Sequence, residues 1–361
     1  MAPTRVAGDA GRRAPIGRSR GRRLAGPAGA GRLLPGCDTP GMSLISVADL
    51  AASLNDPDLR IADVRWSLAA PGGGRHAHAT AHLPGAIFVD LETVLTAPLG
   101  PGRHPLPDPA TFAAALAALG IGHGHRVVAY DDAGGTVAAR LWWMLDTLGH
   151  ARVAVLDGGL SAWRDAGLPL IANVPAHLPA EPVARPGHGV AWPRTIDGQT
   201  LAARLPEVLL LDARAPERYR GEIEPIDRVP GHIPTALNLP TSALLGGDGR
   251  FLKPDALAAR FAVAGVADRS GADSAARSGG GVSATVDGAG PVGGAAGQVV
   301  VSCGSGVNAC QLALAMREAG LPDPLLYPGS YSDWTRSGMP IAVGNEPGQP
   351  PVSSLAPGGT A

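Results

Sequence analysis

The chain has 361 residues, enough for two domains of ordinary size, and 45% of them are apolar, enough for buried cores. Residues 1–41 hold eight arginines against two acidic residues, so a net charge of −1 leaves the rest of the chain acidic. An acidic body argues against nucleic-acid binding, and no apolar run approaches the roughly 20 residues of a membrane span. Three cysteines are too few for a disulfide framework and indicate a reducing compartment, so we expect a cytoplasmic protein.

The N-terminal stretch, residues 1–42, consists mainly of Arg, Gly, Ala and Pro without apolar periodicity, which predicts disorder. A basic, acid-poor start is also typical of an organelle transit peptide. A third interpretation is that translation begins at Met42 and that the preceding segment is not native. The sequence leaves these interpretations open.

From Leu44 onward the chain has the pattern of a globular domain in which strands alternate with helices. We expect strands at 60–65, within 81–90, at 126–130 and at 153–156, and helices at 47–54, 111–119, 136–148 and from 158. This alternation is typical of an α/β domain with a largely parallel sheet.

The same order of landmarks then returns about 150–170 residues further on, which indicates an internal duplication. The paired landmarks are the strand ends Asp63 and Asp212, the turns at His82 and His232, the helices 111–119 and 253–263, the strands 127–130 and 299–302, and the segments 153–163 and 325–334. We therefore expect a first domain at 43–172, a Pro-rich linker at 173–195 and a second domain at 196–343.

Two low-complexity segments have no counterpart in the repeated pattern. Residues 267–297, rich in Ala, Gly and Ser, predict a flexible surface insertion in the second domain, which is tolerated because loop-closure entropy grows slowly with length. Residues 344–361 predict a disordered C-terminal tail.

The chemistry is expected at Cys303, the first residue after the apolar run 299–302. Gly304 and Gly306 follow it, and then a helical pattern begins at Ala309. A strand, a tight loop and a helix in this order can direct backbone N–H groups and the positive end of the helix toward one anion. A cysteine in that field is expected to react as a thiolate, whereas a purely structural cysteine would not need the flanking glycines.

These features together resemble the two-domain rhodanese family of sulfurtransferases over about residues 44–343. The motifs that carry the resemblance are Asp131-Asp132-Ala133-Gly134-Gly135, Ala138-Ala139-Arg140-Leu141-Trp142-Trp143, Leu156-Asp157-Gly158-Gly159, Asp212-Ala213-Arg214, Arg218-Tyr219-Arg220-Gly221-Glu222, Gly231-His232-Ile233-Pro234 and the Cys303 loop. The resemblance implies tandem rhodanese-like domains, each a mostly parallel sheet flanked by helices. It also implies that the first domain is non-catalytic, since Asp131 stands where the second has Cys303.

The family's chemistry implies that the Cys303 thiolate takes the outer sulfur of a donor, becomes a persulfide, and passes the sulfur to cyanide, a thiol or thioredoxin. This chemistry needs no metal and no organic cofactor. We expect no nucleic-acid partner, no membrane partner and a monomer. The implied substrate-binding residues are Arg218, Gly304, Ser305, Gly306, Val307 and Asn308, with the loop amides stabilising the anionic sulfur.

The loop sequence bears on the choice of donor. Thiosulfate-preferring members resemble Cys-Arg-Lys-Gly-Val-Thr and mercaptopyruvate-preferring members resemble Cys-Gly-Ser-Gly-Val-Thr, so the segment 303–308 resembles the second group, with Asn308 in place of Thr. By match to the family, Arg218 would hold a donor carboxylate by a charge-assisted pair. Its structural alternative is a surface salt bridge.

A second substrate arginine often follows Glu-Pro in mercaptopyruvate enzymes. Here Glu224-Pro225 is followed by Ile226-Asp227, and the nearest arginine is Arg228, which we retain as a further candidate.

Other functions and roles compete with this prediction. A thiosulfate-preferring enzyme and a non-catalytic sulfur-binding or sensor module are the alternatives within the family. A phosphatase would need an arginine six positions after the cysteine, where this chain has Ala309. Arg140 is expected to support the domain interface and Cys310 to be buried, and the two cysteines lack the ligand spacing of a metal site.

Overall fold

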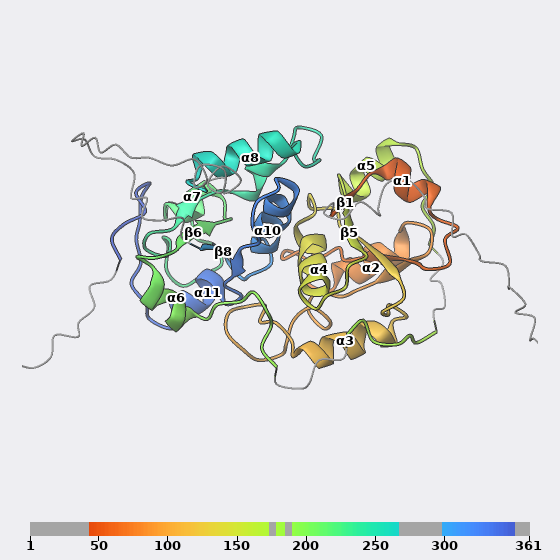
Figure 1. The fold of residues 1–361 in the computed structure, drawn as a ribbon, viewed down its shortest axis with the longest axis horizontal. Helices are drawn as coiled ribbons and strands as arrows, with labels where there is room; N and C mark the ends of the chain where they lie inside the picture. Colours follow the sequence, from red (N-terminus) through yellow and green to blue (C-terminus); the bar gives the residue numbers. More distant parts are fainter. Residues whose placement is uncertain (1–42, 173–177, 185–189, 267–297, 351–361) are drawn as a thin grey trace, which may run out of the picture. The chain divides into compact units, whose positions relative to one another are not determined.

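The computed structural model describes residues 43–172, 178–184, 190–266 and 298–350 (Figure 1). The predicted basic stretch 1–42 and the predicted insertion 267–297 lie outside the described residues, as do 351–361. Expectations about those segments stay predictions.

The first sheet has five parallel strands in the order β1-β5-β4-β2-β3 (Figure 1). The strands are β1 (Leu44–Ile45), β2 (Leu59–Asp63), β3 (Ala86–Phe88), β4 (Arg126–Tyr130) and β5 (Val153–Leu156). The helices are α1 (Val47–Ala52), α2 (Gly73–Thr80), α3 (Pro109–Ala118), α4 (Thr136–Thr147) and α5 (Gly159–Asp165). Val127 and Val155 pack in the apolar cluster that contains α3 and α4, while Val128 and Ala154 pack in the one that contains α1 and α5. Both faces of the sheet are therefore covered, which explains why its central strands are continuous apolar runs.

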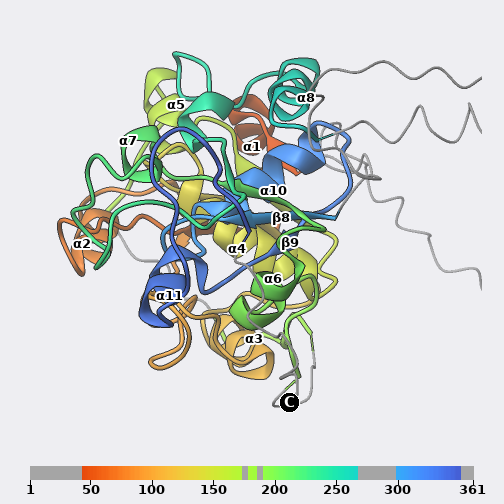
Figure 2. The ribbon, with the colours of Figure 1, turned by 90° about the vertical axis from the view of Figure 1, so that its left-hand side faces the viewer.

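The second sheet has four parallel strands in the order β7-β6-β8-β9. The strands are β6 (Leu209–Asp212), β7 (Leu237–Asn238), β8 (Val299–Ser302) and β9 (Leu325–Leu326). The helices are α6 (Gly198–Arg204), α7 (Pro216–Tyr219), the 3₁₀ helix η1 (Thr241–Leu244), α8 (Pro254–Val263), α10 (Ala309–Glu318) and α11 (Ser330–Arg336). Figure 2 shows α10 on one side of β8 and β9 and α6 and α11 on the other, in agreement with the apolar clusters that each side forms.

The two sheets share one topology. Strands β9-β8-β6-β7 correspond in order to β5-β4-β2-β3, and all neighbours are parallel. The single bridge between Thr195 and Leu326 takes the place of β1, which pairs through Leu44 with Val155. The prediction of an α/β fold with duplicated, mostly parallel sheets is confirmed.

Two segments are more ordered than the sequence suggests. In the predicted linker, Trp192 is buried, lies against the rings of Phe112 and Trp143, and donates its Nε1–H to the Pro107 carbonyl at 2.6 Å. In the predicted C-terminal tail, residues 344–350 are described, and Gly344 N–H donates to the Arg220 carbonyl at 2.9 Å. The expectation of disorder therefore does not hold for 344–350.

Helices α4 and α10 pack against each other, and one apolar cluster continues from the first sheet to the second through them. An ion-pair network borders this contact. Asp146 of α4 accepts from Arg317 of α10 at 3.0 Å and also pairs with Arg194, and both arginines pair with Asp323. The helices that follow β4 and β8 thus belong to one continuous core.

The loop after β4 is filled by the side chain of Asp131. This fully buried carboxylate accepts four backbone N–H groups, from Ala133, Gly135, Val137 and Ala138, at 2.8–2.9 Å. The loop therefore has the form of an anion-binding site in which the bound anion is the protein's own Asp131 carboxylate.

We expect Asp131→Ala to lower the free energy of unfolding by about 3–5 kcal/mol, because four buried donors lose their acceptor. Urea unfolding followed by circular dichroism measures this loss. Asp132→Ala is the matched control: its side chain is exposed, and a change within about 0.5 kcal/mol is expected. Equal effects of the two substitutions would contradict this role of Asp131.

Candidate active site

Cys303 lies at the carboxyl end of β8, in the loop equivalent to the one that Asp131 fills. Its Sγ accepts hydrogen bonds from the backbone N–H groups of Ser305 at 3.4 Å and Gly306 at 3.1 Å. The Cys303 N–H donates to the Ser330 Oγ at 3.1 Å, and Ser330 has a left-handed φ of 52°, an uncommon conformation for a residue other than glycine. The Cys303 sulfur thus faces two aligned N–H donors.

Gly306 is required by the geometry of this loop. Its φ is +79°, and a Cβ there would lie 2.3 Å from the Pro328 carbonyl oxygen. Its own carbonyl accepts from Arg140 Nη1 at 3.0 Å and from the Cys310 thiol at 3.4 Å. Contacts on both sides of Gly306 therefore fix the orientation of the N–H that faces Cys303.

Arg140 is a fully buried cation that reaches this loop from α4 of the first repeat. Besides Gly306, it donates to the carbonyls of Leu95 at 3.2 Å and His104 at 2.9 Å. Burial lowers the pKa of Arg140, and the nearby Cys310 and Cys303 sulfurs oppose that shift. Arg140 thus contacts both repeats, as the expected interface role requires, and it also places positive charge near the Cys303 sulfur.

Cys310 lies at the second residue of α10 and is fully buried. Burial raises the pKa of its thiol to about 12, so it remains protonated near neutral pH. A protonated, inaccessible thiol is a poor nucleophile, which favours a packing role over a role as a resolving thiol.

A cavity of about 440 Å³ opens beside Cys303, which is itself only 2% exposed. Five of the predicted site residues line it: Arg218, Gly304, Ser305, Val307 and Asn308. Gly306 lies behind them, at the sulfur. Arg228 is exposed and is not part of the lining. The first repeat contributes Trp66, Arg103, His104 and Thr136, so the cavity wall comes from both repeats.

His104 is a site residue that the sequence patterns did not reveal. Its Nδ1 lies 2.9 Å from the Ser305 Oγ, and the ring meets Trp66 edge to face at a centroid distance of 5.2 Å. Burial, with smaller contributions from the charges of Arg140 and Arg103, lowers the pKa of His104 to about 4. The imidazole is therefore neutral at pH 7 and can exchange a hydrogen bond with the serine hydroxyl.

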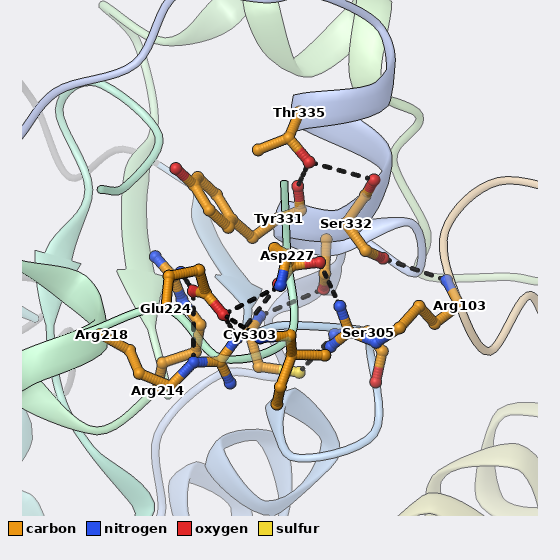
Figure 3. Close-up of polar contacts among 12 residues, drawn as sticks. Arg103, Arg214, Arg218, Glu224, Asp227, Cys303, Ser305, Tyr331, Ser332 and Thr335 are labelled. Carbon is orange, nitrogen blue, oxygen red and sulfur yellow. Dashed lines mark hydrogen bonds and ion pairs between the residues drawn. The ribbon is translucent and has the colours of Figure 1, made fainter. Parts of the chain in front are cut away.

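Arg218 takes part in an ion-pair cluster at the wall of the cavity (Figure 3). Its Nε and Nη2 donate to the two oxygens of Glu224 at 3.2 and 2.7 Å, and Nη2 also donates to Asp227 at 3.0 Å. Asp227 pairs in addition with Arg103, a first-repeat residue that the sequence patterns also left unmarked. The signal that could have found Arg103 and His104 is an ionisable pair in a Gly- and Pro-rich loop, the kind of segment that often carries function.

The two carboxylates of this cluster respond differently to burial. Burial alone would raise the pKa of Glu224, but the hydrogen bonds from Arg218 and the backbone outweigh it, and the pKa is lowered. For Asp227 burial prevails over Arg103 and Arg218, and the pKa is raised. Glu224 is thus firmly held as an anion, while Asp227 is the weaker partner.

The described residues contain no group of three or more His, Cys, Asp or Glu side chains placed to hold a metal ion. Of the helices the structure describes, none is long and apolar enough to cross a bilayer. The arrangement brings together a cysteine sulfur, backbone N–H donors that face it, and cations beside a small cavity. This combination suits covalent transfer of a group from a small anion.

Comparison with known proteins agrees with this chemistry. The family described as the rhodanese-like domain matches the chain twice, at residues 46–166 and 198–337. A solved structure, the 3-mercaptopyruvate sulfurtransferase from Leishmania major, aligns with a TM-score of 0.66 and 30% identity over 83% of this chain and 76% of that one.

Relatives with higher identity carry two different donor names. A Pseudomonas aeruginosa protein named "Probable 3-mercaptopyruvate sulfurtransferase" is 42% identical over 309 residues, covering 84% of this chain and 98% of the relative. A Mycobacterium tuberculosis protein, provisionally named a thiosulfate sulfurtransferase, is 40% identical over 299 residues, covering 82% and 94%. The two names agree on the reaction class and differ on the donor.

Proposed function

This chain belongs to the rhodanese family and is a two-domain sulfurtransferase, and from that premise we propose that Cys303 carries the transferred sulfur as a persulfide. The thiolate attacks the sulfur of 3-mercaptopyruvate, a sulfur–sulfur bond forms, and the carbon–sulfur bond breaks. The proton of the 3-mercaptopyruvate thiol passes to the carbon atom of the broken bond. The products are therefore a Cys303 persulfide anion and pyruvate. An acceptor thiolate or cyanide then attacks the outer sulfur and regenerates the Cys303 thiolate.

The observation that carries this proposal is the pair of N–H donors at the Cys303 sulfur. A persulfide moves negative charge outward by one sulfur, toward the cavity lined by Gly304 and Ser305. Aligned amide dipoles in a water-poor site stabilise such charge without having to reorient during the reaction. The Ser305 hydroxyl, in contact with His104, is placed to donate a hydrogen bond to the bound 3-mercaptopyruvate.

We propose 3-mercaptopyruvate as the preferred donor. The loop has neutral Gly304 and Ser305 where a thiosulfate enzyme resembles Arg-Lys, and Arg218 offers a cation to a carboxylate at the cavity wall. The donor in the name of the Pseudomonas relative agrees with this preference. Thiosulfate is the second candidate donor, on the strength of the Mycobacterium relative.

Steady-state kinetics with the two donors in parallel tests the preference. We expect a higher kcat/KM for 3-mercaptopyruvate than for thiosulfate. Arg218→Ala should raise the KM for 3-mercaptopyruvate by roughly 10- to 100-fold, because it removes a charge-assisted pair. Equal or better use of thiosulfate by the wild type would contradict the donor assignment, and unchanged kinetics in the variant would remove Arg218 from the site.

We further propose that the first repeat, 43–172, does not catalyse, because Asp131 fills its anion-binding site and no thiol stands there. The second repeat, 196–343, holds the nucleophile, and 173–195 joins the two. A thiol such as thioredoxin as acceptor, a monomeric state and a cytoplasmic location stay predictions. The sensor alternative predicts binding of sulfur without turnover, which the same kinetics distinguish.

A further inference from the structure

A loop of the first repeat is fastened to the second repeat next to the cavity. Arg103 N–H donates to the Ser332 Oγ at 3.0 Å, and Arg336 Nη1 donates to the Gly102 carbonyl at 2.9 Å; Ser332 and Arg336 are both in α11. Gly102 has a φ of +80°, and a Cβ there would lie 2.5 Å from the Gly329 carbonyl oxygen. The backbone at Arg103 is therefore held in place from two sides, and its side chain enters the cavity.

Arg103 and Arg218 share one counter-ion. Asp227 pairs with Nη1 of Arg103 and accepts from Nη2 of Arg218 at 3.0 Å, and Figure 3 shows dashed lines from its carboxylate to both arginines. Glu224 already holds Arg218 by two hydrogen bonds. Asp227 thus fixes two guanidinium groups that come from different repeats, and both side chains remain partly exposed, at 20% and 16%.

The remaining guanidinium nitrogens converge on the residue that follows the nucleophile. Nη2 of Arg103 lies 2.7 Å, and Nη1 of Arg218 3.5 Å, from the place a Cβ on Gly304 would occupy. Neither nitrogen has a hydrogen bond to another residue that the structure describes. Since Gly304 has no side chain, both guanidinium groups can approach its backbone beside Cys303, where an added Cβ would crowd Arg103.

We propose that Arg103 is a second donor-binding cation, which together with Arg218 holds the carboxylate of the sulfur donor, and that Asp227 is the positioning residue for both. This inference rests on the proposed function and deepens it. It replaces Arg228, which lies on the surface, as the second arginine of the site. It also gives the first repeat a direct part in substrate binding.

The test uses pyruvate, which carries the donor carboxylate but no sulfur, to protect Cys303 from alkylation by iodoacetamide. In the wild type we expect saturable protection, and in Arg103→Ala the half-protecting concentration should rise roughly 10- to 100-fold, as expected for losing a charge-assisted pair. Arg103→Lys keeps the charge but loses the planar set of guanidinium donors. Its half-protecting concentration should lie between those of the wild type and Arg103→Ala. Arg220→Ala is the matched control, because Arg220 pairs with exposed Glu222 outside the cavity. Pyruvate should protect this variant as well as it protects the wild type.

Turnover supplies the second readout. The kcat/KM of Arg103→Ala should fall by the same factor with 3-mercaptopyruvate, and should stay within about threefold of wild type with 1-mercapto-2-propanone, which lacks the carboxylate. An equal fall with both donors would show a merely structural role and overturn the inference. If Arg103→Ala loses its fold, as a lower melting temperature would reveal, Arg103→Gln keeps a polar side chain without the charge and carries the same comparison.

The outcomes separate the two proposals. Protection by pyruvate that depends on Arg103, without turnover of 3-mercaptopyruvate, would support the carboxylate site and refute the proposed function. Turnover through Cys303 with full pyruvate protection in Arg103→Ala would leave the function standing and refute the inference. Absence of pyruvate protection in the wild type would also refute it.

Discussion

Cys303→Ser is expected to reduce sulfur transfer from either donor by on the order of 10³-fold or more, because a serine hydroxyl is not ionised near neutral pH and cannot form a persulfide. The substitution is nearly isosteric, and the buried Oγ would still face the N–H groups of Ser305 and Gly306. Folding should therefore be retained, and the loss should appear in kcat. Steady-state assays with 3-mercaptopyruvate and with thiosulfate measure it.

The other described cysteine provides the control for this substitution. In Cys310→Ser the hydroxyl can still donate to the Gly306 carbonyl, as the thiol does now at 3.4 Å, so turnover should persist. Turnover that survives in Cys303→Ser but disappears in Cys310→Ser would assign the nucleophile to α10 and contradict the assignment to Cys303.

Gly306→Ala should produce the second large effect. The added Cβ would meet the Pro328 carbonyl oxygen at 2.3 Å in a backbone with a φ of +79°, so the loop must move. Moving it withdraws the shorter of the two N–H donors from the sulfur, and loss of one such donor typically costs about 10²–10³-fold in kcat. Stopped-flow measurement of persulfide formation should show this loss.

Gly320→Ala separates backbone strain from the loss of the donor. Gly320 has a similar φ of +71°, follows the end of α10, and has no atom within 4 Å of the added Cβ. It should cost stability by about 1–2 kcal/mol through the left-handed conformation and leave kcat near the wild-type value. A fall in kcat as large as that of Gly306→Ala would show that strain alone explains both variants.

The longer elements of the fold were predictable because their apolar patterns are strong. The expected strands at 126–130, 153–156 and 299–302 agree with β4, β5 and β8 at both ends. Helices at 111–119 and 136–148 match α3 and α4 within two residues. Sequence patterns did not reveal the two-residue strand β1, the polar helix α2, or the short elements α6, α7 and η1. The stability of these elements comes from tertiary contacts, which leave little periodicity in a short segment.

The candidate site was predictable where its residues are local in sequence or, as for Arg218, match a family motif. The segment 303–308 and its cysteine follow from one strand–loop–helix pattern. Arg103 and His104 lie far earlier in the chain and reach Asp227 and Ser305 only because the two repeats pack together. Asp227 follows the position where an arginine was sought, and its role becomes clear only beside Arg103. Spacing within the sequence carries no information about such contacts.

The central claim is that the sulfur in transit is bonded to Cys303, and trapping that intermediate tests it most directly. The protein is treated with 3-mercaptopyruvate or thiosulfate without an acceptor, alkylated, digested and analysed by mass spectrometry. We expect one additional sulfur atom on the peptide that contains Cys303, and its disappearance when cyanide is added before alkylation. Additional sulfur on the Cys37 or Cys310 side chain instead, or none on any cysteine while turnover continues, would contradict the claim.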